Sequence, residues 1–279
     1  MHRIPILLGL LALAFQSVHA AEFTVQRDIP YHSDREQSKY ARERCKLDLY
    51  LPKNTKGFAT MVWFHGGSIQ SGNKNGKIAA PVSARFASEG IAVLTVNYRL
   101  HPKAKFPAYI QDCAASVAWA VENIAKHGGD PAKVFVSGHS AGGYLCAMVG
   151  MDPQYLEKYK LSPNDIAGFI PVAGQMISHS TVRKERGIHR YQPVIDTSAP
   201  SYFVRREAPP FLLLVGDADL PARVEENQLF VAFMKANKNP DIEYHFGKNR
   251  NHGSIASKLA DSDDPGAARM LAFMNKHSQ

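Results

Sequence analysis

The chain has 279 residues and a formal net charge of +8 at pH 7. This length suits one large domain of alternating strands and helices, or two small domains. The basic residues are scattered apart from short clusters at 183–186 and 248–250, and neither cluster is interleaved with aromatic residues that stack on bases. The charge therefore indicates a solvated basic surface, and we predict no nucleic-acid partner.

The first twenty residues have the pattern of a secretory signal peptide. Arg3 precedes an apolar stretch at 4–15, and the small-residue site Val18-His-Ala20 follows. The stretch is too short to span a bilayer, and no later segment has the ~18 uninterrupted apolar residues of a transmembrane helix. We predict cleavage after Ala20, export as a secreted or periplasmic protein, no integral membrane segment, and a single domain over 21–279.

Apolar runs recur along the remaining chain and predict strands. Residues 46–51 alternate as an antiparallel strand does. The later runs are continuous, as in parallel strands that are covered on both faces. They lie at 59–64, 91–96, 134–136, 167–172 and 211–215, with a more mixed run at 242–246.

Segments of helical periodicity separate these runs. One apolar face extends over 110–124, a less strict one over 224–234, and a last helix begins at Pro265, where proline suits the first turn. The alternation predicts an α/β fold, a mainly parallel central sheet with helices on both faces. The polar, basic segment 175–210 interrupts it and predicts a short cap or active-site loop.

The three cysteines, Cys45, Cys113 and Cys146, do not form a disulfide framework. Cys113 and Cys146 fall within apolar helical patterns and are predicted to pack as small hydrophobic residues. The sequence leaves open one bridge among the three. No pair has metal-ligand spacing, so we predict no metal.

The run at 134–136 leads into Gly138-His-Ser-Ala-Gly142. This pattern predicts a strand, a sharp turn with Ser140 at its tip, and a helix. Such a turn exposes the serine hydroxyl to a base, and its tight backbone leaves room only for glycine on either side. We predict that Ser140 is a nucleophile.

A second candidate motif, His65-Gly-Gly-Ser68, directly follows the run at 59–64. Ligands bind at such strand ends in open α/β sheets. The glycines let the backbone turn its N–H groups into the crevice. With the N–H of Ala141, those of Gly67 and Ser68 would then stabilise an oxyanion. The alternative interpretation is a plain Gly-Gly turn.

The third candidate motif, Gly216-Asp-Ala-Asp219, follows the run at 211–215. A carboxylate there would orient a histidine and stabilise its imidazolium form. Asp219 is preferred because it lies further out and is better placed to reach across the crevice. Asp217 could instead hold the turn together. The spacing alone does not decide between the two.

His252, in Asn249-Arg-Asn-His-Gly253, follows the last strand and is the predicted general base. His139 is inside the serine turn and is predicted to point away from Ser140. The remaining histidines considered are at less suitable positions: His101, His127, His179 and His189. The predicted triad therefore has the chain order Ser140, Asp219, His252.

With these motifs, the chain resembles the esterase/lipase group of the α/β-hydrolase superfamily. It is most similar to hormone-sensitive-lipase-like carboxylesterases and to bacterial feruloyl and acetyl-xylan esterases. The resemblance extends from Leu47 to the C-terminus and is weakest across 175–210. Four stretches carry it: His65-Gly-Gly67; Asn97-Tyr-Arg-Leu-His-Pro102 with Phe106-Pro-Ala108 and Asp112; Gly138-His-Ser-Ala-Gly-Gly143; and Asp219 with His252.

The resemblance implies an α/β-hydrolase fold and a serine carboxylic-ester hydrolase that needs no cofactor and acts through an acyl-enzyme. The chain departs from the group at Ser68, where a third glycine is common, and in its short cap, which argues against a lipase with a large lid. We therefore expect the substrate to be an ester of a short-chain or polymer-linked acyl group, either a small molecule or an ester attached to a polysaccharide. An arylformamidase-like amide hydrolase and a non-catalytic binding protein are the alternatives.

Overall fold

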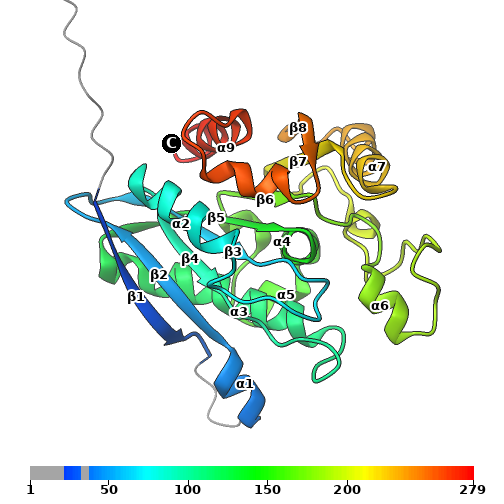
Figure 1. Ribbon diagram of the computed structural model, residues 1–279, viewed down its shortest axis with the longest axis horizontal. Helices are drawn as coiled ribbons and strands as arrows, with labels where there is room; N and C mark the ends of the chain where they lie inside the picture. Colours follow the sequence, from blue (N-terminus) through cyan, green and yellow to red (C-terminus); the bar gives the residue numbers. More distant parts are fainter. Residues whose placement is uncertain (1–21, 33–37) are drawn as a thin grey trace, which may run out of the picture.

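The computed structural model describes residues 22–32 and 38–279, so the predicted signal peptide lies outside the described residues. Its centre is an eight-stranded sheet in the order β1-β2-β4-β3-β5-β6-β7-β8. β2 pairs antiparallel with β1 and β4, and every other neighbouring pair is parallel. Helices cover both faces of this sheet (Figure 1). The predicted fold class, a mainly parallel sheet between helices, is confirmed.

The strands are β1 (Phe23–Pro30), β2 (Lys46–Pro52), β3 (Phe58–Phe64), β4 (Ala92–Val96), β5 (Gly129–His139), β6 (Gly168–Val172), β7 (Phe211–Ala218) and β8 (Ile242–Asn251). The α-helices are α1 (Lys39–Arg44), α2 (Ala79–Ser88), α3 (Ala108–Asn123), α4 (Ala141–Met151), α5 (Gln154–Glu157), α6 (Ser180–Glu185), α7 (Arg223–Ala236), α8 (Ser254–Ser257) and α9 (Pro265–Lys276). Short 3₁₀ turns are η1 (Ile124–His127), η2 (Pro163–Asp165), η3 (Pro200–Phe203) and η4 (Lys258–Ala260).

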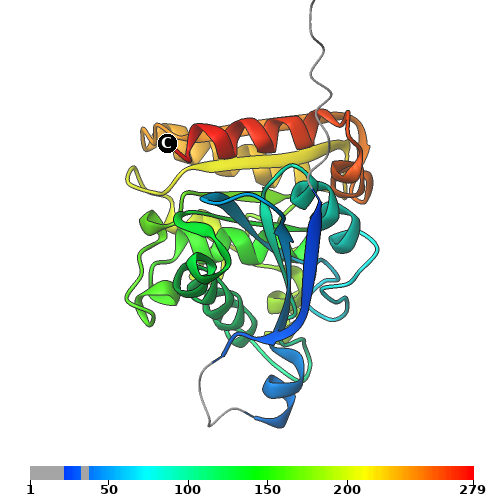
Figure 2. The same ribbon diagram turned by 90° about the vertical axis from the view of Figure 1, so that its left-hand side faces the viewer.

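The sheet separates two hydrophobic cores. Along β3, Val62 and Phe64 pack into the core beneath α3 and α4, whereas Met61 and Trp63 pack into the core beneath α2 and α9. Figure 2 shows α9, in red, and α3, in green, on opposite sides of the sheet. Because both faces are buried, successive residues of the inner strands must all be apolar, which explains the continuous runs.

Among the elements of eight residues or more, two were not predicted. β1 is an edge strand whose residues are half-buried or exposed, so it carries no apolar run that would mark it. Its pairing with β2 supplies the structure that its own composition does not. The second is α2, which buries one face against the sheet beside β4.

The three cysteines are free thiols, and all are buried. Cys113 lies in α3 and Cys146 in α4, among apolar neighbours of one core. The bridge that the sequence left open is therefore absent. Over residues 22–32 and 38–279, none of the helices combines the length and the apolar character that crossing a bilayer requires.

The segment 175–210, called the cap below, contains only two short helical elements, α6 and η3. Figure 1 shows α6 beyond the edge of the helical layers, on the same side as α7. The cap connects the carboxyl end of β6 to the start of β7.

Candidate active site

Ser140 occupies a sharp turn between β5 and α4. Its backbone has φ 57° and ψ −115°, a conformation that residues other than glycine rarely adopt. The turn is fixed by a hydrogen bond of 2.9 Å from Ser140 N to Val172 O. A Cβ atom at Gly138 would lie 2.6 Å from the carbonyl oxygen of Gly142, so this position accepts only glycine. The close packing of this turn thus holds Ser140 in its strained backbone conformation.

A chain of hydrogen bonds joins Ser140 to two residues from other strand ends. Nε2 of His252 lies 2.8 Å from Oγ of Ser140, and Nδ1 of His252 lies 2.7 Å from Oδ1 of Asp219. The Asp219 side chain is fully buried. Although burial raises the pKa of Asp219, the hydrogen bond and charge of His252 lower it below the usual range. The carboxylate is therefore ionised beside the imidazole.

Asp217 has a different environment from Asp219. Its carboxylate is exposed and accepts hydrogen bonds of 2.9 Å from Asn249 N and 3.0 Å from Arg250 N. These bonds lower the pKa of Asp217. The structure thus brings Asp219 to His252, whereas Asp217 joins the end of β7 to the end of β8, just before His252.

His139 makes a contact that the sequence interpretation missed. Its Nε2 lies 2.7 Å from the carbonyl oxygen of His252, and the two rings are 4.8 Å apart. Burial, with a smaller effect of His252, lowers the pKa of His139 to about 4. The neutral ring therefore donates its Nε2 proton to that carbonyl. No local pattern marks this contact, because it joins residues 113 positions apart.

The loop after β3 turns tightly beside Ser140. Gly67 has φ +111°, and Ser68 and Ile69 also have positive φ. Gly67 O accepts from the N–H groups of Gln70 and Ser71, each at 2.9 Å. Among the described residues, no backbone or side-chain acceptor is recorded for the N–H of Gly67 or Ser68. A Cβ atom at Gly66 would lie 3.3 Å from Cβ of Ser140, so the loop and the serine are in close contact.

Two side chains support this loop from behind. Tyr98 stacks on His65, with ring centroids 4.3 Å apart, and its hydroxyl donates to His65 O at 2.6 Å. Arg44 donates to Gly72 O at 2.7 Å, which fixes the far end of the loop. Tyr98 belongs to the Asn97–Pro102 stretch, whereas Arg44 lies before all the motifs and had no sequence signal.

Ser140 and Ser68 open onto a pocket of about 390 Å³. The cap forms one wall, and the loop before α7 with the first turns of that helix forms the other. Four exposed apolar side chains, Tyr191, Ile195, Leu220 and Leu229, contribute to this lining. The pocket is therefore built from the segment that interrupts the strand–helix alternation and from α7.

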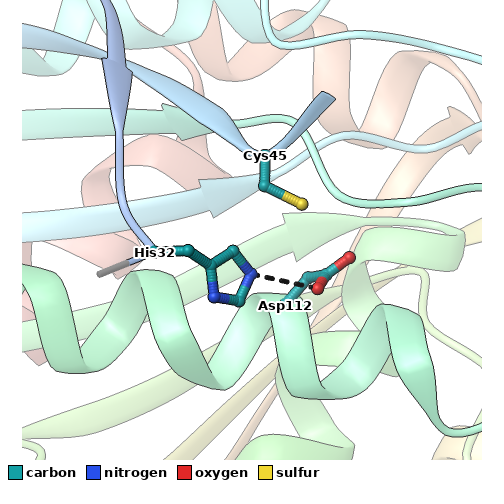
Figure 3. Close-up of side chains that lie close together, drawn as sticks. All are labelled: His32, Cys45 and Asp112. Atoms are coloured by element: carbon teal, nitrogen blue, oxygen red, sulfur yellow. Dashed lines mark hydrogen bonds and ion pairs between the residues drawn. The ribbon is translucent and has the colours of Figure 1, made fainter. Parts of the chain in front are cut away.

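A second polar cluster lies away from this pocket. His32, Cys45 and Asp112 have ligand-type atoms within 4.8 Å of one another, and His32 Nε2 lies 3.2 Å from Asp112 Oδ1 (Figure 3). Both Asp112 oxygens also accept hydrogen bonds from Arg99. Burial raises the pKa of the Cys45 thiol to about 12. A protonated thiol and a carboxylate already neutralised by a guanidinium do not suit a cation, so the cluster fits a structural role.

The sheet, its strand order and the serine turn define the class of protein: this is the α/β-hydrolase fold. The family model described as BD-FAE matches residues 47–170. Esterase LipC of Mycobacterium tuberculosis is 30% identical over 227 residues, which are 74% of this chain and 56% of the relative.

Solved structures agree on the fold. A truncated carbohydrate esterase from gut microbiota has a TM-score of 0.76 at 20% identity, covering 93% of this chain and 98% of that one. Thermogutta terrifontis esterase 2, in a form phosphoramylated by tabun, has a TM-score of 0.66 at 22% identity and covers 93% of each chain. In sequence and in fold the chain is similar to the esterase/lipase family of α/β-hydrolases. It spans about half the length of the curated relatives it matches.

Proposed function

We propose that the protein is an exported serine carboxylic-ester hydrolase. The observation that carries this proposal is the chain of hydrogen bonds from Ser140 through His252 to Asp219 at the mouth of a pocket. Similarity to this family and the esterase names of several relatives support it. Export rests on the signal-peptide pattern with its site after Ala20.

In the first half-reaction, Oγ of Ser140 attacks the ester carbonyl carbon while Nε2 of His252 takes the hydroxyl proton. The distance of 2.8 Å between these atoms suits that transfer. Asp219 accepts a hydrogen bond from the Nδ1–H of His252, which fixes the useful tautomer and stabilises the imidazolium. The strained backbone at Ser140 keeps the hydroxyl in this position before substrate binds.

The carbonyl oxygen becomes negatively charged in the tetrahedral intermediate. We assign its stabilisation to the backbone N–H groups of Gly67, Ser68 and Ala141, which flank Ser140 from two loops. His252 then gives its proton to the leaving alcohol. Water, activated by His252, attacks the acyl-enzyme and releases the acid. Every step uses groups of the chain and water.

We propose a short-chain or polymer-linked acyl ester as the substrate. The short cap and the pocket of about 390 Å³ support a substrate smaller than a long-chain lipid. The likeness to a carbohydrate esterase supports a sugar or polysaccharide on the alcohol side. An ester panel of increasing acyl length that includes acetylated xylan and methyl ferulate would identify the acyl group.

The test is the variant Ser140→Ala. We expect p-nitrophenyl acetate hydrolysis to fall by about 10⁴-fold or more, with an unchanged circular dichroism spectrum. Retained turnover would contradict the proposal. A fluorophosphonate should label the wild-type protein and not the variant, and failure to label the wild type would favour a non-catalytic binding protein. Faster turnover of N-formylkynurenine than of a phenyl ester would favour the arylformamidase alternative.

A further inference from the structure

The pocket that contains Ser140 carries more positive than negative charge. Its lining includes three guanidinium groups, those of Arg183, Arg190 and Arg223, and two carboxylates, those of Glu225 and Glu226. Arg183 comes from α6, Arg190 from the loop that follows it, and the other three from the first turns of α7. The proposed function uses none of these side chains.

Arg183 is a buried cation that forms no ion pair among the described residues, although the charge of Glu226 acts on it from a greater distance. The residue is 3% exposed, and its guanidinium donates to Gln192 O at 2.9 Å and to Arg190 O at 2.6 Å. Its buried Nε has no hydrogen-bond partner, and no carboxylate of the described residues is recorded within ion-pair distance. These carbonyl contacts fix the cap loop, but they carry no charge, and Glu226 offsets the buried positive charge only in part.

Arg223 is 7% exposed and donates to Ala173 O. Its Nε lies 3.9 Å from Oε2 of Glu226, which is too long for a hydrogen bond. Both of these atoms are buried without partners. Burial also raises the pKa of Glu226. Glu226 therefore offsets part of the charge of both Arg223 and Arg183, and the buried Nε of Arg223 has no acceptor.

Arg190 is exposed, and its guanidinium carbon lies 5.1 Å from the ring centroid of Tyr191. In the part of the chain that the structure describes, no ion pair of Arg190 is recorded. α7 also begins at this wall, and Ala222 provides no side-chain cap for its first N–H groups. The positive end of the helix thus adds to the field of the three guanidinium groups.

The apolar part of the lining limits what else the ligand contains. Tyr191, Ile195, Leu220 and Leu229 are exposed around the same pocket. Apolar side chains at this place bind an alkyl or aryl segment, and guanidinium groups bind a planar carboxylate in a bidentate manner. A ligand that satisfies both has a reactive ester, an apolar spacer and a terminal anion.

We propose that the pocket selects esters that carry a carboxylate at the far end of an apolar acyl or alcohol chain. This specificity rests on the proposed function, because the ester must reach Ser140. Arg190 and Arg223 bind the carboxylate, and the buried guanidinium of Arg183 contributes its positive charge to the same pocket. Glu225 is exposed in the same lining and weakens binding of the anion.

The experiment compares matched pairs of esters. The acyl pair is monomethyl adipate and methyl hexanoate, and the alcohol pair is 6-acetoxyhexanoate and hexyl acetate. We measure kcat/KM for each at low ionic strength. We expect the anionic member of one pair to be preferred by about tenfold, and added salt to reduce this ratio. The pair that shows the preference identifies the side of the ester that the pocket binds.

Variants then assign the preference to the pocket. Arg190→Gln should lower the ratio of anionic to neutral kcat/KM about tenfold, and Glu225→Gln should raise it. The matched control is Lys184→Gln, which removes one exposed charge from α6 at a residue that does not line the pocket. It should keep the wild-type ratio.

The outcomes separate the two proposals. Hydrolysis of neither member of either pair by protein that hydrolyses p-nitrophenyl acetate would overturn the carboxylate preference, whereas absence of p-nitrophenyl acetate hydrolysis as well would contradict the esterase function itself. Hydrolysis of the neutral esters with a ratio at or below one in both pairs would overturn the carboxylate preference and leave the esterase function standing. A preference that is unchanged in both Arg190→Gln and Glu225→Gln would also overturn this assignment.

Discussion

His252 is held at three points by groups from two other parts of the chain. Ser140 and Asp219 contact its two ring nitrogens, and His139 contacts its carbonyl oxygen. A histidine on a loop has many accessible rotamers, so these contacts reduce the freedom of the ring before substrate binds. The position of His252, the proposed general base, therefore depends on Asp219 and His139 as well as on Ser140.

The two aspartates of the β7 end give a matched pair of variants. Asp219→Asn should reduce kcat by about 10²–10⁴-fold, because the amide no longer stabilises the imidazolium and favours the wrong tautomer. Asp217→Asn keeps one of the two acceptor oxygens and loses the charge and one backbone hydrogen bond at an exposed site away from His252, so we expect less than about a tenfold loss. Steady-state kinetics on p-nitrophenyl acetate measure both. Equal losses would contradict the assignment of Asp219.

His139 is expected to act as a positioning residue. Replacement by Leu removes the donor to His252 O, so kcat should fall about tenfold or more with little change in KM. Glutamine places an N–H group at the same number of bonds from the backbone as Nε2, so His139→Gln should recover most of the lost kcat. If the Leu and Gln variants have the same kcat, the hydrogen bond has no role in catalysis.

At the scale of elements, two turns bring backbone N–H groups to one point. The strained residue Ser140 starts α4, and the loop after β3 runs through successive positive φ values at Gly67, Ser68 and Ile69. β3 and β5 are parallel neighbours in the sheet, so their carboxyl ends place both turns side by side. The strand order thus assembles the proposed oxyanion site.

Gly67→Ala tests the loop, with Gly57→Ala as its control. Both glycines have positive φ, but a Cβ atom at Gly67 would collide with the backbone of Ser71, whereas one at Gly57 meets no atom within 4 Å. We expect Gly57→Ala to cost about 1 kcal/mol of unfolding free energy with normal activity. Gly67→Ala should lose about 10²–10³-fold in kcat, the usual effect of a lost oxyanion donor. Normal kcat in Gly67→Ala would argue against this loop as a donor.

At the scale of the whole molecule, three buried histidines couple folding to pH. Burial is the largest cause that lowers the pKa of His65 and of His179 to about 3, and that of His139 to about 4. In the unfolded chain a histidine has a pKa near 6.5. Between these values the unfolded state binds more protons than the folded state, so acid favours unfolding.

The free energy of unfolding should therefore fall as the pH drops below about 6.5. Each histidine contributes a slope of at most about 1.4 kcal/mol per pH unit, so several kcal/mol should be lost between pH 7 and pH 5. Urea unfolding at a series of pH values measures this loss. His139→Gln should make the dependence shallower, because it removes one of the three groups. A flat profile in the wild-type protein would contradict the expectation.

Much of the fold could be predicted because the inner strands are buried on both faces. This burial requires the continuous apolar runs that marked β3 to β7, and the serine turn requires glycine at positions such as Gly138. β1 could not be predicted, since an exposed edge strand obtains its hydrogen bonds from a neighbour and needs no apolar face of its own.

The mainly parallel sheet, the turn that presents Ser140, and the strand ends that carry polar motifs all follow from the amino-acid sequence alone. These features depend on local burial and local backbone sterics, which leave periodic and glycine patterns. Three contacts were known only once the folded chain was seen: Asp219 and not Asp217 lies against His252, His139 donates to the His252 carbonyl, and Arg183 and Arg223 line one pocket. Those contacts join residues far apart in the chain, and their geometry follows from strand order and loop path, which no local pattern encodes.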